Sequence, residues 1–473
     1  MKSGTLLILG LAVCLSGCTL APKYTRPEAP VPASWPVGPA YQETKSAPGA
    51  PAADELKWQD FFADERLQKV IDMALRSNRD LRIAGLNVER ARAIYGIQRA
   101  ELLPTLNVVG SGGKQRISSD LSSAGKSRTY EEYSVDLGIL SWEIDFFGRI
   151  RSFKDQALEE YLATEQARRS AQILLVSTVA NAYLTFAADQ ENLKLAQSTL
   201  ETQQAFYDLI RRRYELGVSS ELDLRQAQTR VDAARVDIAL YTRLTAQDEN
   251  GLNLLAGSPV PRELLSQDLH SVSPLKEISH GTPSEVLLRR PDVLAAEHRL
   301  RGANANIGAA RAAFFPRISL TTLLGTASDE LSGLFKSGSG TWSFTGQVIM
   351  PIFDARTWSA LDASRAEREI ILAQYERAIQ SAFKEVADAL AQKGTIEDQL
   401  SAQESLVDAA SQTYRLSSIR YTKGIDSYLS VLDAQRSLYE AQQGLVFLRL
   451  ARLTNQVTLY RVLGGGSDPV PGY

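Results

Sequence analysis

The chain has 473 residues, which is enough for a sizeable core and for more than one domain. Its formal net charge of −3, with Lys and Arg spread among Asp and Glu, gives no basic surface for nucleic acid. The two cysteines, Cys14 and Cys18, lie at the N-terminus. The rest of the sequence therefore holds no thiol for a disulfide framework, a zinc–thiolate site or a cysteine nucleophile.

The first residues have the pattern of a secretory signal. Lys2 precedes an apolar run, Leu6–Val13, which is too short to span a bilayer. The run leads into the sequence Leu-Ser-Gly-Cys ending at Cys18, which resembles the cleavage site of bacterial lipoproteins. We therefore expect residues 1–17 to be removed and Cys18 to carry covalent acyl and diacylglycerol groups as a lipid anchor. An ordinary signal followed by an incidental cysteine is the alternative.

A proline-rich segment and a helix come next. Residues 18–54 contain many prolines, which interrupt helices and strand ladders, so an extended tether is expected. A helical pattern then starts near Asp54 and ends before Pro104. This helix is the first element of a longer arrangement that occurs twice in the chain.

The sequence is an internal duplication. The segment Asn78–Pro104 aligns on Arg290–Pro316 at a constant offset of 212 residues, and later segments align at an offset of 207. Identical pairs include Asp80 and Asp292, Pro104 and Pro316, Gly217 and Gly424, and Gly257 and Gly464. The expected divisions are a first repeat at 55–260, a linker at 261–282, a second repeat at 283–466 and a C-terminal tail at 467–473.

Each repeat contains two segments in which polar and apolar residues alternate, at 105–116 and 131–143 and at 317–327 and 341–350. This alternation is typical of membrane β-barrel strands, although a half-buried sheet in water has the same local pattern. We favour barrel strands because no apolar run is long enough for a membrane helix. Four strands cannot close a barrel, for which about eight are needed, so other copies must complete it.

Each repeat ends in a long helical hairpin, expected at 149–256 and 352–463. Neither glycine nor proline occurs between Gly148 and Gly217, which predicts a rod of roughly 100 Å at 1.5 Å per residue. Apolar residues follow a 3.5-residue period from Leu175 to Tyr214, interrupted only by Asp189 and Gln203. That period favours a coiled coil over the core helix of a globular domain.

Six motifs spread along the chain resemble those of the outer-membrane factor (TolC-like) family, and most closely its OprM-type lipoprotein branch. The motifs are Leu-Ser-Gly-Cys18, Trp142-Glu-Ile-Asp-Phe-Phe-Gly148, Arg289-Arg-Pro-Asp292, Asn306-Ile-Gly-Ala-Ala-Arg-Ala-Ala-Phe-Phe-Pro316, Leu432-Asp-Ala-Gln-Arg436 and Leu463-Gly-Gly-Gly466. The resemblance covers essentially the whole chain. It implies an α+β membrane fold: a trimeric 12-stranded outer-membrane β-barrel with four strands per chain, continued by a long periplasmic α-helical coiled-coil barrel.

The resemblance also implies a function and partners. A homotrimer in the Gram-negative outer membrane, in contact with its lipid and extending into the periplasm, would be the exit duct of a tripartite multidrug efflux system. It would passively conduct drugs and other small amphiphiles. The implied partners are a periplasmic membrane-fusion adaptor protein and an inner-membrane pump of the resistance-nodulation-division class.

The family's periplasmic gate can be carried over to particular residues. Leu429 and Asp433 match the narrowest apolar and acidic rings, and their spacing of four puts them on one helix face. Asp223 and Tyr421 match a pair that ties neighbouring helices. The family's second tie is not carried over, because Leu222 and Asp426 stand where TolC has a threonine and an arginine. The adaptor-docking tips that the resemblance implies are formed by Gly217, Val218, Ser219, Gly424, Ile425 and Ser427.

Other classes of function fit the sequence less well. It has no P-loop, no Gly-x-Ser-x-Gly and no His-Glu-x-x-His, so we expect neither an enzyme nor a cofactor or metal site. A periplasmic coiled-coil protein would leave the alternating strands unexplained. Within the channel class, a duct for type I protein secretion or for metal efflux remains the alternative. The three methionines of the chain argue against export of copper or silver.

Overall fold

A computed structural model describes residues 19–41, 51–53, 55–273, 275–279 and 286–466. The predicted signal peptide (1–17), the predicted anchor Cys18 and the predicted tail (467–473) lie outside the described residues. The chain forms two compact units, which we call the sheet unit (Met1–Glu28, Asn87–Thr164 and Ala295–Tyr375) and the tip unit (Ala29–Leu86, Glu165–Leu294 and Glu376–Tyr473). Each unit combines segments of both sequence repeats, so neither repeat is a compact body by itself.

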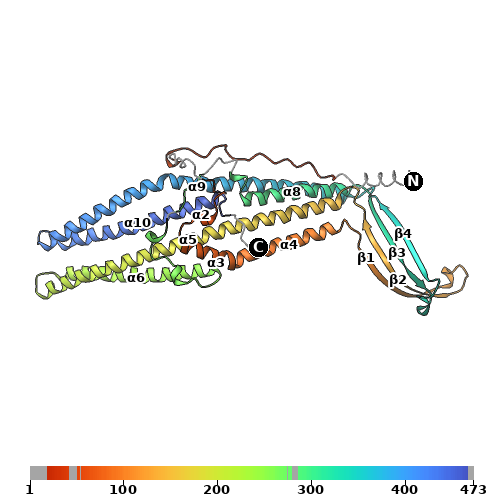
Figure 1. Ribbon diagram of the computed structural model, residues 1–473, viewed down its shortest axis with the longest axis horizontal. Coiled ribbons are helices and arrows are strands. Elements are labelled where there is room, and N and C mark those ends of the chain that lie inside the picture. Colours follow the sequence, from red (N-terminus) through yellow and green to blue (C-terminus); the bar gives the residue numbers. More distant parts are fainter. Residues whose placement is uncertain (1–18, 42–50, 54, 274, 280–285, 467–473) are drawn as a thin grey trace. The chain divides into compact units, whose positions relative to one another are not determined.

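The elements follow the same order in both repeats: helix, two strands, long helix, turn and second helix (Figure 1). The α-helices are α2 (Trp58–Phe61), α3 (Glu65–Ser77), α4 (Arg79–Ala100), α5 (Arg149–Glu215), α6 (Glu221–Ala256), α8 (Pro291–Ala312), α9 (Ala355–Thr422) and α10 (Tyr428–Val462). The strands are β1 (Leu106–Ile117), β2 (Arg128–Glu143), β3 (Arg317–Ser328) and β4 (Gly340–Ile349). Short 3-10 helices are η1 (Pro39–Tyr41), η2 (Ser119–Leu121), η3 (Arg262–Leu264), η4 (Leu269–Ser271) and η5 (Leu331–Gly333).

The helical run predicted from near Asp54 to Pro104 is divided into α2, α3 and α4. The Asp64 carboxylate accepts hydrogen bonds of 2.9 Å from the backbone N–H groups of Arg66 and Leu67, which caps α3. The Asn78 side chain accepts from the N–H of Leu81 at 2.9 Å and separates α3 from α4. A single helix was therefore the wrong expectation, because these polar side chains cap new helix ends.

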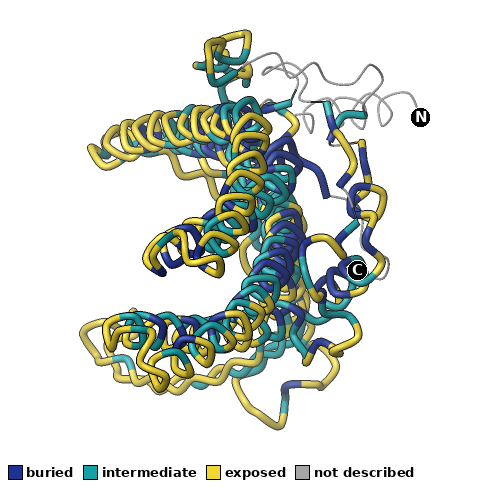
Figure 2. Tube along the Cα trace, turned by 90° about the vertical axis from the view of Figure 1, so that its left-hand side faces the viewer, coloured by how far each residue is buried: buried dark blue, intermediate teal, exposed yellow. Residues whose placement is uncertain are grey.

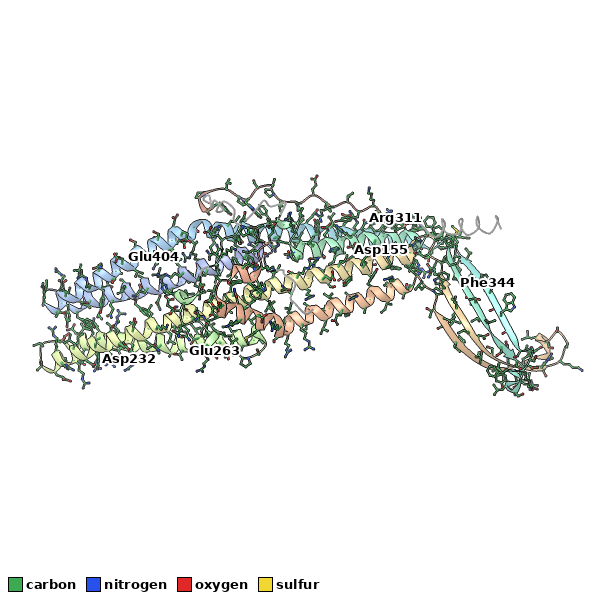
Figure 3. The ribbon with its side chains drawn as sticks, viewed as in Figure 1. Asp155, Asp232, Glu263, Arg311, Phe344 and Glu404 are labelled. Carbon is green, nitrogen blue, oxygen red and sulfur yellow. The ribbon has the colours of Figure 1, made fainter. Side chains whose placement is uncertain are left out.

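The four strands form one antiparallel sheet in the order β1-β2-β3-β4. Backbones approach closely at two glycines of the central strands: a Cβ on Gly138 would lie 2.0 Å from the Thr322 carbonyl oxygen, and one on Gly325 would lie 2.2 Å from that of Val135. Large apolar side chains stay exposed on β4, among them Trp342 and Phe344, of which Phe344 is labelled in Figure 3. Within the described part of the chain, these side chains stay uncovered and no further strand pairs with the outer edges of β1 and β4.

A membrane-helix criterion is met once among the described residues. By length and composition, α5 contains a stretch apolar enough to cross a membrane, and 67% of that stretch is buried inside the chain. The expectation that no apolar run reaches this length is therefore wrong. Residues such as Val179, Tyr183 and Leu184 show the reason, since these apolar positions are fully buried inside the chain.

The first part of the proline-rich segment, which belongs to the sheet unit, is docked against helix α8 of the same unit. The sequence predicted an extended tether for this segment. Glu297 on α8, with a side chain only 3% exposed, accepts bonds from Arg26 at 3.0 Å (Nε) and 2.5 Å (Nη2) and from the Tyr24 hydroxyl at 3.2 Å. Arg311 (labelled in Figure 3) donates to the Leu20 carbonyl oxygen at 3.1 Å. We call residues 19–26 the strap.

Candidate gate and tip turns

The first tip turn reverses the chain between α5 and α6 at Gly217. Its φ of 76° lies in the left-handed region, which glycine adopts without a side-chain clash. The Gly217 N–H donates to the Tyr214 carbonyl at 2.9 Å, and the Val218 N–H donates to the Arg213 carbonyl at 2.9 Å. These two bonds form a Schellman motif, so the end of α5 is fixed by its own backbone.

The second tip turn, between α9 and α10, has the same construction 207 residues later. Gly424 has a φ of 73°, and the N–H groups of Gly424 and Ile425 donate to the Tyr421 and Arg420 carbonyls at 2.9 Å each. An ion pair is added here: Arg420 contacts Asp426 at 2.5 Å (Nε) and 3.0 Å (Nη2). The carboxylate of Asp426 is therefore paired with an arginine of its own turn.

Asp223 stabilises the start of α6 after the first turn. Its carboxylate accepts from the Ser220 N–H at 3.1 Å and from the Ser219 hydroxyl at 3.0 Å, while Ser220 Oγ accepts from the Asp223 N–H at 3.1 Å. Burial opposes ionisation, but the hydrogen bonds from Ser220 and Ser219 hold the pKa of Asp223 below its ordinary value. Ser427 occupies the equivalent position before α10 and makes no side-chain capping bond.

Tyr421 lies close to Asp223, but no hydrogen bond joins the two within the described part of the chain. Its side chain is buried, with the Arg213 guanidinium carbon 5.2 Å from the ring centroid and the Tyr428 ring 5.4 Å away. Burial raises the pKa of the Tyr421 hydroxyl. Tyr421 therefore holds the two hairpins together through packing and a cation–π contact.

The two predicted ring residues lie on one exposed face of α10. Leu429 is 61% exposed, and the Asp433 side chain is 66% exposed. Asp433 accepts a bond of 2.7 Å from Arg436, one turn further on. Sequence reasoning missed this arginine, although its i, i+3 spacing from Asp433 was visible. The acidic position thus carries its own counter-charge.

Apolar side chains gather on the tip turns and on the helix starts that follow them. Figure 2, which faces this end of the chain, shows mainly exposed and half-buried residues there. The exposed ones are Leu216, Val218, Leu222, Ile425 and Leu429, each at least 59% exposed. Exposed apolar groups on two adjoining turns form a surface suited to contact with another protein chain.

Two carboxyl groups between α5 and α6 form a further site that the sequence only hinted at. Asp189, which interrupts the coiled-coil period, lies beside Asp248 of α6 and Asn192 of its own helix. Burial and, for Asp248, the neighbouring charge of Asp189 raise the pKa of both carboxyl groups, that of Asp248 to about 6. The period showed that Asp189 occupies a core position, but it gave no sign of its partner.

Within the described ranges, no group of three or more His, Cys, Asp or Glu side chains is placed to hold a metal ion. The chain instead presents a sheet whose edges and apolar side chains need neighbours, and long helical hairpins with exposed turns. Strands of this kind complete a membrane sheet only with other copies. The fold and site thus define one subunit of a membrane channel.

The chain belongs to the outer membrane efflux protein family, whose profile matches residues 70–258 and 282–465, one segment in each repeat. It is 50% identical over 463 residues to a toluene efflux pump outer membrane protein, TtgC, and equally to an antibiotic efflux pump outer membrane protein, ArpC, both from Pseudomonas putida; each match covers 97% of this chain and 95% of the relative. The solved open state of the Neisseria gonorrhoeae MtrE outer membrane channel is 39% identical, with a TM-score of 0.86 over 95% of this chain and 99% of the other.

These matches confirm the predicted family and fold class. The solved relatives are trimeric outer-membrane channels, to which the four-stranded sheet and long helices of one chain correspond. The chain is therefore an efflux channel of the outer membrane. Members of the family are passive channels and not enzymes.

Proposed function

We propose that three copies of this chain form the exit duct of a tripartite pump for small organic amphiphiles, including aromatic solvents and antibiotics. The observation that carries the proposal is the match to the toluene and antibiotic efflux proteins, with 50% sequence identity over 97% of the chain. The similarity therefore includes the tip turns and the sheet. We propose an inner-membrane pump of the resistance-nodulation-division class as the source of energy, because a passive duct supplies none.

The tip turns are the proposed docking site for the periplasmic adaptor. Both turns have the same backbone construction, and both expose an apolar residue after the glycine: Val218 is 63% and Ile425 59% exposed. Gly217 and Gly424 fix these positions, while Ser219 and Ser427 flank them. Two matched apolar points on each of three chains would give the adaptor a repeated surface to recognise.

The proposed gate lies on α10, beside these turns. Three copies of Leu429 would form an apolar ring, and three copies of Asp433 a ring of carboxylates that favours cations, a preference that the paired Arg436 side chains weaken. Asp223 would act by fixing the first turn through its capping bonds with Ser220. Tyr421 would act by packing against Arg213 and not through a bond to Asp223.

We further propose that Cys18 is the mature N-terminus and is acylated. Thr19, the next residue, has its hydroxyl 3.4 Å from that of Ser152 at the start of α5, and the strap that follows is docked on α8. The first described residues are thus held beside the junction between the sheet and the helices. A chain start fixed at this junction suits an anchor that reaches lipid at the end of a membrane sheet.

The test is complementation in a strain that keeps the adaptor and pump but lacks its own outer-membrane channel. The wild-type chain should restore growth in toluene and resistance to antibiotics. Val218→Trp should abolish both while trimers still form, because it alters the docking surface. Val236→Trp is the matched control, since Val236 is 67% exposed on α6 away from the turn, and it should keep full resistance. Full resistance with Val218→Trp, or no resistance with the wild type, would contradict the proposal.

A further inference from the structure

A cluster of buried side chains joins the two helical hairpins beside the tip turns. We call it the tip cluster. Its buried members are Ile210 (α5), Ala227 (α6), Tyr421 (α9), and Tyr428, Val431 and Leu432 (α10). Because these residues come from all four helices, the tips of the two hairpins can separate only if the cluster opens.

Tyr428 is the residue through which α10 enters this cluster. It is the first residue of the helix and is 3% exposed, with its ring 6.3 Å from Phe206 and 5.4 Å from Tyr421 between centroids. Leu429 and Asp433 belong to the neighbouring, exposed face of the same helix. The packing of Tyr428 therefore sets the position of the proposed gate residues, although Tyr428 itself is not a member of either proposed ring.

The hydroxyl of Tyr428 has no hydrogen-bond partner among the described residues. The titratable and charged groups that face it are Asp223 and Arg230 on α6 and Tyr414 and Tyr421 on α9. None of them bonds to it. A buried hydroxyl without a partner destabilises the packed arrangement, since in water it would be fully hydrogen-bonded. The rings of the cluster stabilise the packing, and this one oxygen atom opposes it.

We propose that Tyr428 is a positioning residue of the gate and that its unpaired hydroxyl lowers the free energy needed to separate the packed tips. When the hairpins separate, the hydroxyl returns to water and regains its hydrogen bonds, so the atom that weakens the packed state favours the separated one. A small contribution from a docked partner at the turns then suffices to open the tips. The inference rests on the proposed gate at Leu429 and Asp433.

Single-channel recording of purified trimers in planar bilayers tests the inference. Tyr428→Phe keeps the ring and removes only the hydroxyl, so the spontaneous open probability should fall roughly tenfold. Tyr428→Ala removes the ring as well and should raise it. Tyr414→Phe is the matched control: Tyr414 packs at the edge of the cluster and is only partly buried, so its loss of a hydroxyl should change little.

Two outcomes would overturn the inference. An unchanged or increased open probability in Tyr428→Phe would show that the hydroxyl does not oppose the packed state. Slower hydrogen exchange in the first turns of α10 should accompany the fall, and unchanged exchange would also contradict the inference. Asp433→Ala, recorded in the same bilayers, separates the two proposals, because failure of the gate assignment would appear in that variant and failure of this inference in Tyr428→Phe.

Discussion

The carboxyl pair between α5 and α6 makes the stability of this hairpin depend on pH. Asp248 is the informative residue to change, because Asp248→Asn keeps the size and hydrogen-bonding capacity of the side chain and removes its charge. Burial and the neighbouring Asp189 raise the pKa of Asp248 from 3.8 to about 6. Since the pKa in the folded chain lies above that of the unfolded chain, folding is favoured when the pair holds a proton.

The magnitude follows from this shift. A rise from 3.8 to about 6 corresponds to about 3 kcal/mol at about 1.4 kcal/mol per pKa unit. Both carboxyl groups retain some exposure, so solvent screening reduces the expected effect to about 1–2 kcal/mol. This stabilisation is complete below about pH 4 and is lost as the pH rises through about 6. At pH 7.5, Asp248→Asn should therefore be the more stable protein.

Hydrogen exchange of α5 and α6 between pH 4.5 and 7.5, corrected for the intrinsic rates, measures this dependence. The wild-type hairpin should lose protection above pH 6, and Asp248→Asn should remove most of that loss. Asp232→Asn is the matched control, because Asp232 lies exposed on α6 in a surface pair with Arg235. If Asp248→Asn left the pH dependence unchanged, the pair would not share a proton and the reasoning would be refuted.

Two further predictions concern the N-terminal segment. Glu297→Ala should destabilise the docked strap by about 2–3 kcal/mol. This is below the usual cost of breaking a buried ion pair, because Arg26 and Arg301 are each more than a third exposed. The rate of protease cleavage near Arg26 measures the effect, and a variant cleaved as slowly as the wild type would contradict it. Cys18→Ser behind an ordinary signal should lose acylation by mass spectrometry yet retain some efflux, and an unmodified Cys18 in the membrane fraction of the wild type would refute the anchor.

The parts of this fold that the sequence predicts are those governed by local periodicity. The long hairpins follow from a glycine-free run with a 3.5-residue period, and β3 from the alternation around Leu320 and Thr322. The tip turns follow from Gly217 and Gly424, because each interrupts such a run.

Contacts between distant residues left no comparable signal. Arg26 and Glu297 are 271 residues apart in sequence, so composition alone indicated a free tether where the chain is docked. The partner of Asp189 on α6 was hidden for the same reason, since Asp248 has the local appearance of a surface carboxylate. The unpaired Tyr428 hydroxyl depends on how four helices meet, which no local pattern describes.

Ion conductance of purified trimers in planar bilayers shows whether the chain forms a passive duct that is gated at its tips. The wild type should show a small, cation-preferring conductance without any energy source. Asp433→Ala removes the ring carboxylate and leaves Arg436 with only its longer contact to Glu440, at 3.9 Å, so conductance should rise and cation preference should be lost. Arg436→Gln should strengthen that preference. A wild type that conducts no ions, or an Asp433→Ala variant with unchanged conductance and ion preference, would contradict the account.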